Sequence, residues 1–109
     1  MNQRHLRINL KNSVKLIWHG LNTPAKIENI SMSGALVRAD LPVKIGEIVA
    51  MHLEDKASPD AMEMDGEVSR TILMLHNMPA FGLKFLKIPE ELRMFLLRTL
   101  AKHNAIIRA

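Results

Sequence analysis

The stretch AFGLKFL, residues 80–86, shows the alternation that decides the fold class. Phe81, Leu83 and Phe85 stand two residues apart, so in an extended strand their side chains share one face. The glycine and the lysine between them share the other face. Because three large apolar side chains gather on one side, we expect this strand to bury that side in a hydrophobic core.

Five more segments with the same two-residue spacing of apolar side chains precede this strand. They cover residues 13–18, 25–31, 34–40, 47–54 and 62–75. Turn-forming residues separate them, as in HGLNTP at 19–24 and HNMP at 76–79. Six short strands with no helix between them predict an all-β fold, either an antiparallel barrel or a sandwich.

The stretch PEELRMFLLRTLAKHNAIIR, residues 89–108, predicts one terminal α-helix. Proline suits the first helical position, and the two glutamates after it complement the positive end of the helix dipole. One apolar stripe is expected to cover the barrel, and its members are Leu92, Phe95, Leu96, Leu100, His103 and Ile107. A second apolar set falls on the opposite side: Met94, Leu97, Ala101 and Ala105. Since one small barrel cannot cover both sides, the second side predicts a homodimer contact or a protein partner.

The composition is that of one globular domain, with 109 residues of which 48% are hydrophobic and 24% charged. The chain contains no cysteine, which excludes disulfides, thiol catalysis and cysteine-bound metal. The N-terminus lacks the apolar core of a signal peptide, and no apolar run approaches the roughly 18 residues that span a bilayer. These features predict a cytoplasmic protein that does not insert into a membrane.

Positive charge is concentrated at the start of the chain. The formal net charge is +4, and five lysines or arginines precede Glu28, the first acidic residue. This asymmetry indicates an anionic partner near the N-terminal arm, with an ordinary solvated basic surface as the alternative. Aromatic side chains are too few to interleave with the basic ones, so a nucleic-acid polymer is not expected as the partner.

The sequence shows no arrangement of residues that is typical of catalysis or metal binding. None of its serines lies in a Gly-x-Ser-x-Gly motif, and no glycine-rich phosphate loop precedes a helix. The five histidines stand singly, without the spacing that two ligands of one metal ion need. We therefore expect a protein that is not an enzyme and that holds no metal or cofactor.

The stretch NISMSG, residues 29–34, has the pattern Asn-x-Ser-x-x-Gly and follows a basic segment, QRHLRINL at 3–10. Downstream come GEVSR at 66–70, GLKF at 82–85 and the terminal helix, in that order. This ordered set resembles the PilZ domain family over essentially the whole chain. The resemblance implies a single domain, a six-stranded antiparallel β-barrel followed by one C-terminal helix. It also implies a receptor for the bacterial second messenger cyclic di-GMP.

The resemblance also implies which residues contact that ligand. It divides the chain into a mobile basic arm (1–12), a barrel (13–88) and a helix (89–108), with Arg4 and Arg7 on the arm and Asn29, Ser31 and Gly34 on the barrel rim. Arginine can pair with a phosphate or with a guanine edge, and its plane can stack on a base. Asparagine and serine can satisfy polar edges of guanine, and glycine permits a positive φ or a close approach of the backbone to the ligand.

One position departs from the family's Arg-x-x-x-Arg pattern. If Arg7 is the second arginine of that pattern, Gln3 stands where the first belongs. The alternative is therefore an adaptor that does not bind the nucleotide and acts by protein–protein interaction. In either case we expect the chain to signal through an unidentified protein partner, because no separate output domain is recognised in it. Two plainer interpretations also remain: the SMSG stretch as an ordinary turn, and the outward helix side as scattered surface residues.

Overall fold

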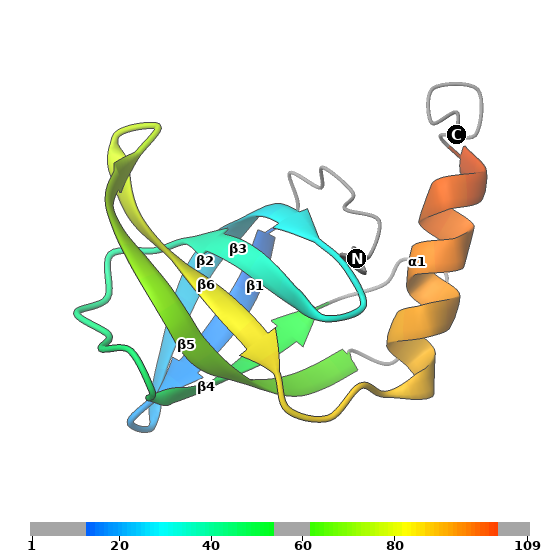
Figure 1. Ribbon diagram of the computed structural model, residues 1–109, viewed down its shortest axis with the longest axis horizontal. Helices are drawn as coiled ribbons and strands as arrows, with labels where there is room; N and C mark the ends of the chain where they lie inside the picture. The colour runs from blue at the N-terminus through cyan, green and yellow to red at the C-terminus, as the bar shows by residue number, and fades with distance from the viewer. Residues whose placement is uncertain (1–12, 54–61, 103–109) are drawn as a thin grey trace, which may run out of the picture.

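The structure, a computed structural model, describes residues 13–53 and 62–102 and contains six strands and one helix (Figure 1). The elements are β1 (Ser13–Trp18), β2 (Leu21–Ile30), β3 (Gly34–Arg38), β4 (Ile48–Leu53), β5 (Met62–Leu75), β6 (Met78–Phe85) and α1 (Glu90–Lys102). The predicted arm of residues 1–12 and the part of the predicted helix beyond residue 102 lie outside the described residues.

The strands form a closed antiparallel barrel in the order β1-β2-β3-β6-β5-β4. β1 closes it by pairing with β4, where Leu16 lies opposite Met51. The prediction of a six-stranded antiparallel barrel with one terminal helix is confirmed, and the sandwich alternative is wrong. Closure leaves every strand with two neighbours, which removes the exposed sheet edges that an open sandwich would have to protect.

Two hairpin turns are shorter than the sequence predicts. β1 and β2 are joined by His19 and Gly20 alone, with φ values of 51° and 78°. β5 and β6 are joined in the same way by His76 and Asn77, with φ values of 52° and 68°. A positive φ at both central residues is what a two-residue type I′ hairpin requires. β2 therefore begins at Leu21 and not at residue 25 as predicted.

The interior of the barrel is filled by alternate residues of all six strands, and the predicted inward face of β6 is confirmed. Phe81, Leu83 and Phe85 are all buried in the main hydrophobic cluster. Leu92, Phe95 and Leu96 of α1 belong to the same cluster, so the helix packs on the barrel with the predicted stripe. No helix in the described part of the chain is both long and apolar enough to cross a bilayer.

The outward side of α1 is also as predicted where the structure describes it. Met94 is 43% exposed and Leu97 is 50% exposed. The inward side continues with Thr99, which is buried and whose hydroxyl donates a hydrogen bond of 2.9 Å to the carbonyl oxygen of Phe95. The members of the two predicted stripes from residue 100 onward lie beyond the side chains that the structure describes.

Candidate ligand-binding groove

The NISMSG stretch forms the connection between β2 and β3, and Ser31 organises it. The Ser31 amide donates a hydrogen bond of 2.8 Å to the carbonyl oxygen of Gly34. The Ser31 hydroxyl accepts a hydrogen bond of 3.2 Å from the Ser33 amide and lies 3.1 Å from the Ser33 hydroxyl. Ser31 is only 2% exposed. Its side chain therefore shapes the turn, while Ser33 is exposed at its surface.

Gly34 allows β3 to lie directly against β6. A Cβ atom at this position would lie 2.1 Å from the carbonyl oxygen of Leu83, a distance that real Cβ atoms essentially never show. The obstacle is backbone and cannot swing aside. Gly34 is not among the residues with positive φ. The structure therefore requires glycine here for a reason that we did not predict: the backbone of the neighbouring strand β6, and not a ligand, lies against this position.

A groove of about 380 Å³ opens beside this turn, on the outer surface of β3, β5 and β6. It is lined by Ser33, Gly34, Ala35, Leu36, Ser69, Arg70, Gly82, Leu83 and Lys84. The volume is within the range of small-molecule sites, about 300–1,000 Å³. Arg70 and Lys84 are exposed cationic side chains, and the lining contains no aspartate or glutamate. Electrostatically, the groove favours an anion.

The two glycines of the groove remove side chains from part of its floor. Gly34 lies opposite Lys84 in the β3–β6 pairing, and Gly82 lies opposite Arg70 in the β5–β6 pairing. A Cβ atom on Gly82 would lie 3.2 Å from the Cγ atom of Arg70 and 3.2 Å from the hydroxyl of Ser69. The stem of Arg70 thus lies over Gly82. A flat group could replace it there if the arginine side chain swung aside.

Asn29 reaches this side of the barrel through a β-bulge. Val37 and Leu36 are consecutive on β3, but their partners on β2 are Ile27 and Asn29. Glu28 is therefore the extra residue of the bulge. Asn29 pairs with Leu36, which lines the groove. Of the three predicted rim residues, Gly34 lines the groove, whereas Asn29 pairs with the lining residue Leu36 and Ser31 lies buried in the adjoining turn. Arg4, Arg7 and Gln3 lie outside the described residues.

Sequence patterns do not predict three residues of the groove: Ser33, Arg70 and Lys84. The alternation in residues 80–86 already places Lys84 on the same strand face as Gly82. The local sequence does not show that Gly34 pairs with Lys84, or that Arg70 pairs with Gly82, because each pair joins two different strands. The two cations can be recognised as groove residues only once each is seen opposite a glycine of the adjacent strand.

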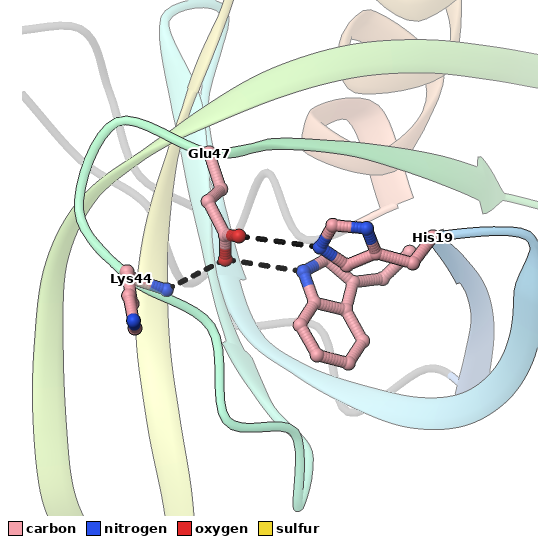
Figure 2. A network of polar contacts seen from close by, with 4 residues as sticks. His19, Lys44 and Glu47 are labelled. Carbon is pink, nitrogen blue, oxygen red and sulfur yellow. Dashed lines mark hydrogen bonds and ion pairs between the residues drawn. The ribbon is translucent and has the colours of Figure 1, made fainter.

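A second polar network, at Glu47, ties the β1–β2 turn to the loop before β4 (Figure 2). One carboxylate oxygen of Glu47 accepts hydrogen bonds from the Lys44 amide at 2.8 Å and from the Trp18 indole N–H at 3.1 Å. The other lies 3.2 Å from Nε2 of His19. The Lys44 amide first, then Trp18 and His19, hold the pKa of Glu47 below its ordinary value. None of these residues lines the groove, so the network serves the fold.

Comparison with known proteins gives a family and a fold. A family model for the PilZ domain matches residues 2–102. The Borreliella burgdorferi PlzA protein, solved in complex with c-di-GMP, is 21% identical with a TM-score of 0.68 over 86% of this chain and 39% of its own. The Bacillus subtilis inhibitor of motility MotI/DgrA is 15% identical with a TM-score of 0.76 over 99% of this chain and 54% of its own. The chain thus spans about two fifths of PlzA and about half of MotI.

A third structure, the PilZ domain of CeSA from a cellulose-synthesizing bacterium, is 14% identical with a TM-score of 0.62. The match covers 91% of this chain and 98% of the CeSA domain. The comparison with curated proteins found no match. At these identities the solved structures establish the fold, and the family model, which matches most of the chain, establishes the family. The resemblance seen in the sequence is confirmed: the chain belongs to the PilZ domain family.

Proposed function

We propose that this PilZ domain binds cyclic di-GMP in the groove on β3, β5 and β6 and passes the signal to a protein partner in the bacterial cytoplasm. The observation that carries the proposal is the convergence of the Ser31–Gly34 turn, the two glycines Gly34 and Gly82, and two cations on one groove. PlzA, a structural neighbour, was solved in complex with the same nucleotide.

The chemistry of the groove matches the chemistry of the ligand. Cyclic di-GMP has two phosphate groups and two guanines. Arg70 and Lys84 can neutralise phosphate, and arginine can in addition read a guanine edge with two parallel hydrogen bonds. Once the Arg70 side chain swings aside, Gly82 can receive the flat face of a base. Ser33 offers a polar group within the groove, and Asn29 lies beside it as the partner of Leu36.

The basic arm completes the proposed site. Arg4 and Arg7 would close over the nucleotide from outside the barrel and add two further cations to those of the groove. Ordering of residues 1–12 on binding would change the surface that the domain shows to its partner. In this division of the chain, residues 13–88 hold the ligand and residues 89–108 carry the contact with the partner.

Calorimetric titration of the full chain with cyclic di-GMP tests the proposal. We expect measurable binding whose affinity falls as salt rises, because phosphate pairing contributes to it. Arg70→Ala should weaken binding, whereas Arg93→Ala should leave it unchanged. The two variants lose the same charge, but Arg93 lies on α1, pairs with Glu90 at 3.1 Å and does not line the groove. Equal affinities in both variants would contradict a site at Arg70.

A nucleotide-free adaptor is the second candidate, and Gln3 is the observation that favours it. If Arg7 is the second arginine of the family's pattern, Gln3 replaces the first, and loss of one bidentate contact costs about 1–3 kcal/mol of binding free energy. Absence of binding heat at high micromolar nucleotide, from protein shown to be folded, would support the adaptor over the receptor.

For the partner contact, either candidate uses the outward side of α1. Met94 and Leu97 are exposed apolar side chains one turn apart. Replacing both by glutamate should abolish a homodimer or partner complex while nucleotide affinity is preserved, and sedimentation velocity measures the first effect. Lys15→Glu, at an exposed position of β1, changes the net charge by the same two units and is the control. Wild-type protein that sediments as a strict monomer would remove the homodimer.

A further inference from the structure

A buried ion pair joins β2 and β3 close to the proposed site. Its Arg38 lies two residues after the groove residue Leu36 but does not line the groove. Nε of Arg38 on β3 lies 3.2 Å from a carboxylate oxygen of Glu28 on β2. Their side chains are 17% and 9% exposed, so both charges are largely removed from water. His76, from the turn between β5 and β6, approaches the same carboxylate oxygen at 3.6 Å. Three separate segments of the chain therefore meet at Glu28.

Glu28 is also the residue that breaks the register of β2. Ile27 and Ile30 are both fully buried in the core, although they are three residues apart. In a regular strand, residues three apart point to opposite faces. The bulge at Glu28 resolves this conflict, because the extra residue shifts the alternation by one position. As a result Asn29 pairs with Leu36, on the outer surface that carries the groove, while Ile30 returns to the core opposite Ala35.

We infer that Glu28 and Arg38 are positioning residues for the ligand: their ion pair holds the β-bulge that presents Asn29 and the Ser31 turn to the groove. This inference rests on the proposed function for its consequence in binding. The geometry supports it from both strands. Glu28 precedes Asn29 directly, and Arg38 lies on the strand that Gly34 begins. A buried, paired charge fixes its partner more strictly than an apolar contact of the same size, because an unpaired charge at this depth is strongly unfavourable.

A role in stability alone would also explain a buried ion pair, and one double variant separates the two roles. Glu28→Leu with Arg38→Met replaces both charges by apolar groups of similar length. Such replacements typically leave stability near that of the wild type or above it. The positioning role predicts that the dissociation constant for cyclic di-GMP nevertheless rises by about tenfold or more, because the bulge is no longer held by charge. A purely structural role predicts that a double variant as stable as the wild type also binds cyclic di-GMP with the wild-type dissociation constant.

The control is the equivalent replacement of an exposed Glu–Arg pair, Glu90→Leu with Arg93→Met. These two residues lie 3.1 Å apart on α1, have side chains that are 68% and 58% exposed, and do not line the groove. The control should change neither the dissociation constant nor the structure of the turn. If it weakens binding as much as the Glu28 and Arg38 double variant does, the effect is not specific to the bulge and the inference fails.

A second measurement decides the inference without the ligand, so that its failure can be told from failure of the proposed function. Amide hydrogen exchange of Ser31, whose N–H is bonded to the Gly34 carbonyl, reports the turn in the free protein. In the Glu28 and Arg38 double variant this amide should exchange about tenfold faster or more, while amides of β4 keep their rates. Wild-type protein without affinity for cyclic di-GMP would refute the proposed function only. Unchanged exchange at Ser31, or unchanged affinity in a folded double variant, would overturn the positioning role.

Discussion

Gly82→Ala is the substitution that separates ligand binding from folding most cleanly. The added methyl group would lie 3.2 Å from the Arg70 Cγ atom and 3.2 Å from the Ser69 hydroxyl. Both neighbours are side-chain atoms that can yield by a few tenths of an ångström. We therefore expect the free energy of unfolding to change by less than about 1 kcal/mol, partly because alanine loses less backbone entropy than glycine on folding.

The same methyl group occupies the floor on which we place a guanine. A methyl group that overlaps a bound base should cost about 1–3 kcal/mol, as overpacking does, and this raises the dissociation constant about five-fold to more than a hundred-fold. Calorimetric titration of Gly82→Ala with cyclic di-GMP measures the change, and thermal unfolding of the same sample verifies the fold. A folded Gly82→Ala protein with wild-type affinity would refute the placement of the ligand on this floor.

Three further predictions concern other parts of the molecule. Gly34→Ala should destabilise the barrel by about 3 kcal/mol or more, because the new Cβ atom meets the Leu83 carbonyl at 2.1 Å; a melting temperature within a few degrees of the wild type would contradict this. Because the folded-state pKa of Glu47 lies below its unfolded value, the ionised carboxylate stabilises the fold at neutral pH, and this contribution is lost as the pH falls below about 4.3 and through the folded pKa. Glu47→Gln should thus melt earlier than the wild type at pH 7, with a gap that narrows in acid, as followed by Trp18 fluorescence; a gap independent of pH would show that the charge is not responsible. Gln3→Arg should tighten nucleotide binding by about 1–3 kcal/mol if it restores the motif, and an unchanged dissociation constant would show that the arm is aligned wrongly.

Much of the fold follows from local patterns in the sequence. The two-residue alternation around Phe81 and the turn residues between segments predict the strands, and the spacing of Leu92 and Phe95 predicts the buried side of the helix. The hairpin at His19 was predicted too long, because Pro24 is a typical turn residue yet lies within β2, opposite Lys15. Its place there depends on the partner strand, which the local sequence does not reveal.

The candidate site was only partly predictable, since much of it depends on pairing between distant strands. The turn at Asn29–Gly34 is a continuous motif and was found. Arg70 and Lys84 join it only through the register of β5, β6 and β3. The bulge at Glu28 was not predicted. The sequence does indicate it, because Ile27 and Ile30 are large apolar residues three apart in one strand, and both are buried.

The most direct test of the central claim is a titration of ¹⁵N-labelled protein with cyclic di-GMP, followed by amide chemical shifts. If the groove is the site, the amides of Ser33, Gly34, Gly82 and Lys84 should shift progressively and saturate together. The indole N–H of Trp18, held by Glu47 and outside the groove, should stay in place. Shifts confined to other residues, or a spectrum of folded protein that does not change at all, would contradict the account.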